Sequence, residues 1–337
     1  MWERVLTNGH GIAATTIAGF GGLFADAFLG KYGFRTTLAL ALLILLLGVI
    51  KEWRLQRLYK NETIPVPVVI SIDDNTPEEL LFKGLVRSIA ANDSRFEKLD
   101  EKLERYFNIS SRMLTFKYDG DMYDNDRLVS FLQIIRYVLN DVQSRMEHKA
   151  EFHILCLRRP AFGVALGGMF RTDGIVVYQN NDYANRLDRV ARITSRKYKE
   201  KIAVFRHFDV HKEISTSGDS RLLVAVQISS HNVSVDHPSL QKYRNVITMV
   251  SRGNGTLPTD KESLEHDLWV EHAQEIYNVI NEQKGEYEEI ALVHSMPEAI
   301  GVILGMALEN YWNIDVYQFD AGAYKVVINL KQIKYYF

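Results

Sequence analysis

The chain has 337 residues, and its 40 Lys and Arg residues against 42 Asp and Glu residues give a formal net charge of −2. This near-neutral balance excludes broad binding of duplex nucleic acid, so any site for phosphate groups must be local. The single cysteine, Cys156, lies in the apolar run FHILCL, so no disulfide can form within the chain. A chain of this length can hold a short membrane element and one duplicated soluble domain.

The first fifty residues are far more apolar than the rest. An uncharged apolar run extends from Thr36 to Ile50, basic residues follow at positions 51, 54, 57 and 60, and an almost uncharged stretch precedes it from Gly11 to Leu29. With its flanking aromatic residues, the run approaches the roughly 20 residues that cross a bilayer. A signal peptide would need a basic start and a small-residue cleavage site, which the segment lacks. We therefore predict a transmembrane hairpin over residues 1–53, with spans at about 10–30 and 35–53, and a basic juxtamembrane linker over 54–63.

The charges after the second span predict its orientation. Basic flanks stay on the cytoplasmic side, so the soluble part is expected to face the cytoplasm. In the first span, small residues recur every four positions on one helical face, which favours contact between helices, and the stripe ends in an acid. These membrane candidates are Ala14, Ala18, Gly22 and Asp26. Asp26 either lines a pore in an oligomer or is an interfacial carboxylate paired with Lys31 or Arg35.

Strands and helices alternate after the linker. Short β-branched runs predict strands, and longer amphipathic stretches predict helices. The expected strands are 64–72, 152–157, 174–179, 221–229, 289–295, 313–319 and 325–330. The expected helices are 126–148, 160–170, 262–283 and 297–310, with a further helix that opens at Pro77. This order predicts an α/β fold with parallel sheets.

The second half of this region repeats the first. GVALGGM in the first half corresponds to GVILGMA in the second, and VYQ follows each after nearly equal gaps. Each copy carries two glycines four residues apart on one helix face, at 163 and 167 and at 301 and 305. That spacing lets a helix approach a sheet closely. We expect two Rossmann-like lobes, at about 64–183 and 200–337, related by a pseudo-two-fold axis.

These repeated segments resemble a known signature. A strand with a short proline turn, a helix with spaced glycines and a strand closing in VY resemble SAVED domains, in which two CARF-type lobes are fused. The resemblance covers roughly 64–337 and is sharpest at 289–319. With the apolar hairpin in front, the chain resembles a transmembrane SAVED effector of CBASS antiphage systems.

The resemblance implies a function. The ligand would be a cyclic oligonucleotide, with a trinucleotide favoured, made by a partner nucleotidyltransferase of the CD-NTase type. Ligand binding would drive homo-oligomer formation and disruption of the bacterial inner membrane in abortive infection. No cofactor, metal or duplex DNA is expected.

Candidate ligand-binding residues follow the ends of the expected strands, because ligands of parallel α/β sheets lie beyond the carboxyl ends of the strands. In the first lobe they are Ser71, Asn75, Thr76, Arg158, Arg159 and Tyr178. In the second lobe they are Ser229, Ser230, His231, Asn232, Ser295, Met296 and Tyr317. Hydroxyls, amides and guanidinium groups suit phosphates and base edges, and the tyrosines can stack on a base. The alternatives are caps and turns for the small polar residues, a solvated pair for the arginines and core packing for the tyrosines.

A basic segment follows the first lobe. Its arginines recur at intervals of three or four residues, whereas 260–289 is rich in acids. The two surfaces can meet between protomers, the basic one can contact anionic lipid or ligand, or the segment is an ordinary solvated helix. The predicted oligomerisation residues are Arg186, Arg189, Arg192 and Arg196.

Motifs of enzymes are missing from the sequence. It contains no GxxxxGK[ST], GxGxxG, HExxH or GxSxG segment. His207 and His211 have helical metal-ligand spacing but no companion ligand, which favours a surface or capping pair. We therefore predict a receptor that is not an enzyme. The alternatives are a membrane-tethered ring nuclease, or phosphodiesterase, that degrades a cyclic oligonucleotide, and a nucleotide-gated channel.

Overall fold

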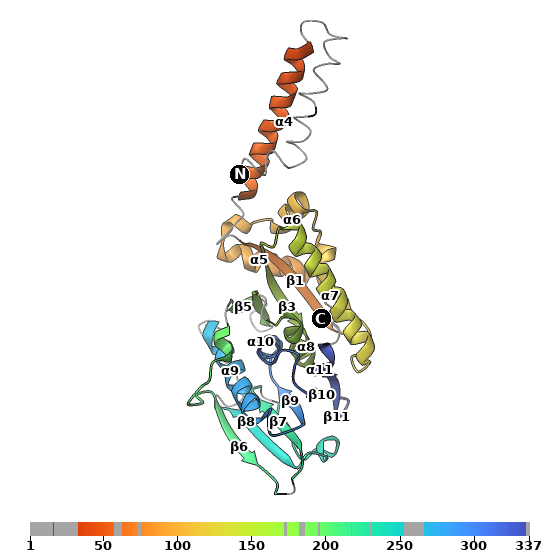
Figure 1. Ribbon diagram of the computed structural model, residues 1–337, viewed down its shortest axis with the longest axis vertical. Helices are drawn as coiled ribbons and strands as arrows, with labels where there is room; N and C mark the ends of the chain where they lie inside the picture. The colour runs from red at the N-terminus through yellow and green to blue at the C-terminus, as the bar shows by residue number, and fades with distance from the viewer. Residues whose placement is uncertain are drawn as a thin grey trace. The chain divides into compact units, whose positions relative to one another are not determined.

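The computed structural model describes residues 16, 33–56, 63–72, 76–171, 174–181, 186–194, 196–216, 218–229, 231–252 and 266–334. The chain divides into two compact units, Met1–Ile64 and Pro65–Phe337. Figure 1 traces both units, coloured from the N-terminus to the C-terminus.

In the N-terminal unit the structure describes one long helix, α4 (Gly33–Gln56). Its surface is apolar: Leu38, Leu40, Leu42, Leu43, Leu46 and Leu47 are between 44% and 58% exposed. Thr37 and Ala41, one turn apart on another face, are buried. Among the residues described, none of the helices combines the length and the apolar character needed to cross a bilayer. The membrane candidates Ala14, Ala18, Gly22 and Asp26 lie outside the described residues.

The first lobe of Pro65–Phe337 is built on a five-stranded sheet with the order β2-β1-β3-β4-β5. Its strands are β1 (Ile64–Ile72), β2 (Thr115–Tyr118), β3 (Ala150–Leu157), β4 (Ile175–Asn181) and β5 (Arg186–Ile193). Its helices are α5 (Glu78–Asn92), α6 (Leu99–Phe107), α7 (Asn125–Arg145) and α8 (Pro160–Phe170). All nine residues of β1 are buried, as expected for a strand covered on both faces.

The second lobe is built on a six-stranded sheet with the order β11-β10-β9-β7-β8-β6. Its strands are β6 (Phe208–Glu213), β7 (Arg221–Gln227), β8 (Asn245–Ser251), β9 (Glu289–Ser295), β10 (Ile314–Asp320) and β11 (Ala323–Asn329). Its helices are α9 (His266–Gln283), α10 (Glu298–Leu308) and the short α11 (Leu330–Ile333). Read from β11 to β8, this order matches that of the first sheet from β5 to β2.

The two sheets also match in detail. In each, the strand after the glycine-rich helix pairs in parallel with the strand before it and antiparallel with the next strand. The antiparallel pairing is irregular at the same place, between Val177 and Tyr178 and between Val316 and Tyr317. The prediction of duplicated lobes is confirmed, whereas that of purely parallel sheets is wrong at the edge strands β5, β6 and β11. The chain is therefore an α/β protein with two mixed sheets.

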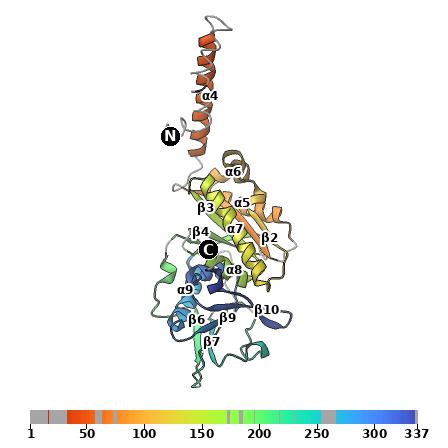
Figure 2. The ribbon, with the colours of Figure 1, turned by 45° about the vertical axis from the view of Figure 1, so that its right-hand side comes forward.

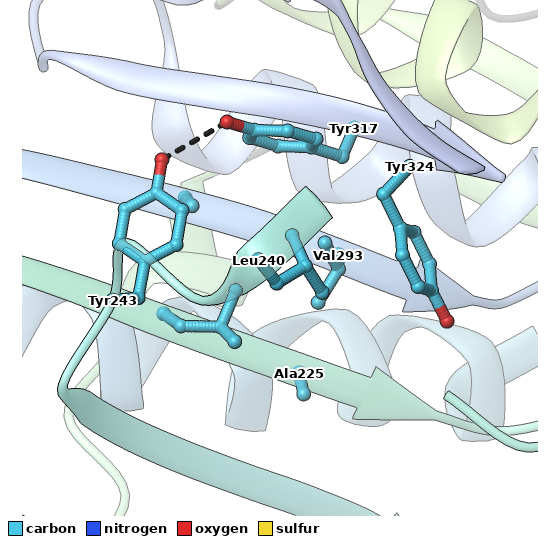
Figure 3. Close-up of a cluster of buried hydrophobic side chains, with 8 residues drawn as sticks. Ala225, Leu240, Tyr243, Val293, Tyr317 and Tyr324 are labelled. Carbon is cyan, nitrogen blue, oxygen red and sulfur yellow. Dashed lines mark hydrogen bonds between the residues drawn. The ribbon is translucent and has the colours of Figure 1, made fainter. Parts of the chain in front are cut away.

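A cluster of buried side chains covers one face of the second sheet (Figure 3). Ala225 of β7 and Val293 of β9 lie on the sheet, and Leu240 and Tyr243 from the segment between β7 and β8 pack over them. The Tyr317 and Tyr243 hydroxyls are 3.0 Å apart and share a hydrogen bond, drawn as the dashed line in Figure 3. Helix α10, by contrast, contacts α8 and the strands β3 and β4 of the first lobe.

Candidate ligand site

Two helices, one from each lobe, form the centre of Pro65–Phe337. Figures 1 and 2 show α8 and α10 between the two sheets. Each begins directly after the central strand of its lobe, α8 after β3 and α10 after β9. Their N-termini therefore lie at the carboxyl ends of the strands, the usual ligand edge of such sheets.

The glycines bring these helices into backbone contact. A Cβ atom on Gly163 would lie 2.9 Å from the carbonyl oxygen of Glu298, and one on Gly301 would lie 2.6 Å from that of Pro160. One turn later, a Cβ on Gly167 or Gly305 would overlap the backbone of the other helix. The first turn of α8 contacts the first turn of α10, so the two helices are parallel and their N-termini are side by side. The predicted role in packing is confirmed, but the predicted partner, a sheet, is wrong: the partner is the other helix.

The opposite ends of these helices are joined by polar contacts between lobes. Arg171, which follows α8, donates to the Oδ1 atom of the fully buried Asn310 over 2.7 Å. Lys199 forms an ion pair with Glu309, which follows α10. Cationic groups next to helix C-termini are favoured by the helix dipole. The two lobes are thus clamped at the end away from the paired N-termini.

At the N-terminus of α10, the cap comes from the first lobe. Gln179 of β4 accepts a hydrogen bond from the Ala299 backbone N–H over 3.1 Å and donates to Glu298 Oε2 over 3.0 Å. This satisfies one of the free N–H groups of the helix end. Burial, and to a smaller degree the negative charge of Glu298, raise the pKa of the Cys156 thiol on β3. Glu298 of the second lobe therefore lies close enough to the first lobe to affect the Cys156 thiol electrostatically.

At the N-terminus of α8, the equivalent residues are not paired in this way. Gln318 holds the place of Gln179, and its Oε1 atom is buried without a hydrogen-bond partner. His294 holds the place of Cys156; it is 6% exposed, and neither of its ring nitrogens has a partner. Burial lowers the pKa of His294 to about 4, so the ring is neutral at neutral pH. Pro160 stands where α10 has Glu298, so this half has no acid at that position.

Arg159, directly before α8, links the two lobes. Its Nη1 atom lies 3.7 Å from Asp320 Oδ1 at the end of β10, and Lys325 lies 3.6 Å from the same carboxylate. Burial, and next the nearby Asp320 carboxylate, raise the pKa of Tyr123 to about 12. The neighbouring Arg158 is exposed and has a φ of 78°, a backbone region that side chains other than glycine rarely adopt. Two predicted arginines thus lie at this N-terminus, and Arg159 is held by an acid of the other lobe.

The predicted small polar residues of the second lobe come together between β7 and β9. Ser229 and Ser295 share a hydrogen bond through their hydroxyls, and the Ser229 N–H donates to the Ser295 carbonyl over 3.0 Å. Asn232 is exposed and accepts from Gln227 over 2.7 Å. His231 is exposed, and Met296 is buried. Ser230 lies outside the described residues.

In the first lobe the corresponding residues are only partly described. Ser71 is fully buried on β1, and its Oγ atom has no hydrogen-bond partner. Thr76 is half-buried before α5, and Asn75 lies outside the described residues. Their role as ligand contacts stays a prediction.

The two predicted stacking tyrosines are core residues. Tyr178 is 1% exposed, and its hydroxyl lies 3.0 Å from Nδ1 of the buried His153. Tyr317 is 4% exposed and bonds to Tyr243. Their surroundings fit the alternative of core packing that the sequence left open.

The predicted oligomerisation arginines do not form a helix. Arg186, Arg189 and Arg192 lie on β5, so the helical interpretation of their spacing is wrong. The pairing of β5 with β4 places Arg189 and Arg192 on the same face of the sheet as Tyr178. Arg192 donates to Glu151 over 2.7 Å. Arg196 belongs to a 3₁₀ turn at Arg196–Lys199.

The histidines with metal-like spacing also have structural surroundings. His211 lies on β6, whereas His207 precedes that strand and its Nε2 atom is 2.6 Å from Glu271 of α9. Among the described residues, no group of histidines, cysteines and acids could hold a metal ion.

Sequence reasoning missed three residues that join the lobes: Gln179, Glu298 and Asp320. The recurring VYQ triplet was the available signal, because its glutamine occupies equivalent positions in the two lobes. Only the packing of α8 on α10 shows that Gln179 reaches across to the other lobe.

Comparisons with known proteins agree with this fold. Residues 188–330 match the family model of the SMODS-associated and fused to various effectors sensor domain, SAVED. The chain is similar in structure to the Acinetobacter baumannii Cap4 SAVED/CARF-domain containing receptor with the cyclic trinucleotide 2'3'3'-cAAA, with a TM-score of 0.50 and 14% identity over 88% of this chain and 56% of that chain. For the Moraxella osloensis Cap4 receptor the TM-score is 0.46, with 14% identity over 95% of this chain and 75% of that one.

At such identities the likeness concerns the fold, and the chain corresponds to 56% of the length of the Acinetobacter receptor. A search of curated proteins found no match. The predicted SAVED resemblance is confirmed over residues 188–330, on a two-lobed α/β fold like that of a SAVED/CARF receptor.

Proposed function

We propose that this chain is a receptor for a cyclic oligonucleotide. The observation that carries the proposal is the side-by-side placement of the α8 and α10 N-termini at the carboxyl ends of both central strands. Each N-terminus bears a partial positive charge, and the α8 N-terminus, which has no acid at the position of Glu298, suits phosphate. A ring with several phosphates matches a receptacle made from two similar lobes.

The comparisons support this ligand class. The Acinetobacter receptor of similar fold was solved with a cyclic trinucleotide, so we favour a trinucleotide here too. A nucleotidyltransferase of the CD-NTase type would supply it. Arg158, Arg159, Ser229, Asn232 and Ser295 are among the described candidates for polar ligand contacts.

A thermal-shift panel tests the receptor proposal. The full-length chain in detergent is melted with cyclic di-, tri- and tetranucleotides, and the nucleotides are recovered afterwards by chromatography. We expect one ring to raise the melting temperature and to be recovered intact. Recovery of linear products would show that the chain is a ring nuclease. If no ring shifts the melting temperature, both the receptor proposal and the ring-nuclease alternative are excluded.

We further propose that the chain acts at the bacterial inner membrane, with the sensor facing the cytoplasm. The exposed leucines of α4 support an apolar environment for that helix, because so much apolar surface is costly to leave in water. Ligand binding would assemble protomers, and the clustered hairpins would permeabilise the bilayer in antiphage defence. Dye release from liposomes tests this step: cyclic tri-adenylate is expected to trigger leakage, and Asp26→Ala to change it if Asp26 lines a pore.

Assembly through the basic surface of β5 is the remaining part of the proposal. Reversal of charge at Arg189 is expected to weaken ligand-induced oligomers, measured by analytical ultracentrifugation. Reversal at Arg192 would also break the contact with Glu151. Oligomers that form unchanged in Arg189→Glu would exclude Arg189 from the interface.

A further inference from the structure

The receptacle at the paired N-termini is not symmetric. The glycine contacts make Gly163 equivalent to Gly301, and the same alignment makes Pro160 equivalent to Glu298 and Cys156 equivalent to His294. On one side of the receptacle the acid Glu298 acts on the Cys156 thiol. On the other side, the equivalent positions hold a proline, Pro160, and an imidazole, His294. A ligand would meet different chemistry on the two sides.

The α10 half can accept further hydrogen bonds. Glu298 receives one bond, from Gln179, and no lysine, arginine or histidine pairs with it among the described residues. A carboxylate has about four acceptor sites. The side chain is only partly buried. A negative group with unused acceptors at this point favours a hydrogen-bond donor and disfavours a phosphate.

The α8 half has the opposite character. It has no acid at the position of Glu298, and Arg159 lies directly before the helix. His294 and Gln318, the equivalents of Cys156 and Gln179, have buried polar atoms without partners, and His294 is 6% exposed. Continuing the pairing of Val316 with Leu292 by two residues places Gln318 beside His294. Buried polar atoms without partners are rare, and they indicate a place for another polar group.

We propose that Glu298 selects the base: it accepts a hydrogen bond from the exocyclic amine of one nucleobase, while the α8 half, which carries Arg159 and has a proline at the position of Glu298, receives a phosphate of the same ring. This inference rests on the proposed function and names the residue that determines its specificity. The ring then binds in one of two pseudo-equivalent orientations. Adenine, guanine and cytosine satisfy the requirement for an amine, whereas uracil does not.

Two rings that differ only in the amine test the proposal. The full-length chain in detergent is titrated with 3'3'3'-linked cyclic tri-adenylate and with its analogue in which hydrogen replaces each 6-amino group. A hydrogen bond to a charged acceptor changes affinity by roughly tenfold or more, so the wild-type chain is expected to prefer the amine by about that factor. In Glu298→Leu, which has no acceptor, the two rings are expected to bind equally.

The controls separate this role from folding and from net charge. Glu298→Gln keeps the size of the side chain and one acceptor, so it is expected to reduce the preference and it carries the test if Glu298→Leu does not fold. Glu282→Gln removes the same charge from an exposed position on α9, 4.0 Å from Lys212, and is expected to keep the full preference.

The outcomes are distinct. Equal binding of both rings by the wild-type chain, or a preference that survives in both Glu298 variants, overturns the role of Glu298 and leaves the receptor proposal standing. Failure of the wild-type chain to bind any cyclic oligonucleotide overturns the receptor proposal, and the role of Glu298 with it.

Discussion

Gly167 of α8 and Gly305 of α10 are reciprocal neighbours: a Cβ atom on either one would overlap the backbone of the opposite helix, at Val302 and Val164 respectively. Because the obstacle is backbone in both cases, no rotation of a side chain can relieve it. These two residues set how closely the lobes approach each other, and hence where the two helix N-termini lie.

Substitution of either glycine is expected to separate the lobes. Gly167→Ala or Gly305→Ala should each lower the free energy of unfolding by about 3 kcal/mol, as severe overpacking does. Gly285→Ala is the matched control, because a Cβ there would meet no atom within 4 Å. Urea unfolding followed by tryptophan fluorescence measures the difference, and equal stability of all three variants would contradict the observed helix contact.

The two equivalent glutamines are expected to behave differently. Gln179→Ala removes a cap and the bond to Glu298, which should cost about 1 kcal/mol and weaken ligand binding through a less ordered α10 N-terminus. Gln318→Ala removes an acceptor that has no partner, so stability should stay the same or rise. The pair is compared by urea unfolding, and equal losses for both variants would show that Gln318 is bonded in solution.

Stability is expected to fall on mild acidification because of His294. Burial lowers its pKa from 6.5 to about 4, so between these values the unfolded chain binds more protons than the folded one. The free energy of unfolding therefore decreases as the pH falls from 6.5 toward 4, and His294 contributes roughly 2 kcal/mol of this loss by pH 5. His272, whose pKa burial also lowers to about 4, adds to the total.

A variant isolates the His294 contribution. His294→Met keeps an apolar side chain of comparable size and cannot titrate, so it should lose less stability than the wild-type chain between pH 7 and pH 5. Urea unfolding at the two pH values provides the comparison. An identical loss in both proteins would mean that His294 is not buried as a neutral ring.

Asp320 is expected to compete with the ligand for Arg159. Its carboxylate lies 3.7 Å from Arg159 and 3.6 Å from Lys325, so Asp320→Asn releases both cations for phosphate groups. The affinity for cyclic tri-adenylate should rise severalfold, with a steeper dependence on salt. Asp209→Asn, which loosens an exposed pair with Arg252 on the second lobe, should leave the affinity unchanged. Weaker binding by Asp320→Asn would instead show that Asp320 contacts the ligand or holds the lobes in register.

The elements that form the core could be predicted from the sequence. The bounds of α8 and β9 agree with the expected segments, because both are apolar runs that end in clear turn signals. The strand β5 was missed because its arginines at 186, 189 and 192 have helix-like spacing. The pairing with β4 has an irregularity between Val177 and Tyr178 that shifts the register. This shift puts Arg189 and Arg192 on one face of the sheet, which the sequence alone does not show.

The site was less predictable than the fold. The sequence indicated Arg159, Ser229 and Ser295, because they follow strands of an α/β sheet. It did not indicate that Tyr178 is buried and hydrogen-bonded to His153, since an aromatic residue at the end of a strand suits a core and a ligand edge equally. The cap that Gln179 places on α10 depends on the packing between lobes, which no local pattern encodes.

Calorimetric titration of the full-length chain with 3'3'3'-linked cyclic tri-adenylate, and with the linear trinucleotide of the same bases, tests whether the paired N-termini of α8 and α10 bind a cyclic oligonucleotide. We expect the ring to bind, its affinity to fall as salt is added, and the linear form to bind far more weakly because its ends cannot occupy both helix N-termini at once. If cyclic rings of two, three and four nucleotides all fail to bind, or if ring and linear forms bind alike, the paired N-termini of α8 and α10 are not a receptacle for a cyclic oligonucleotide.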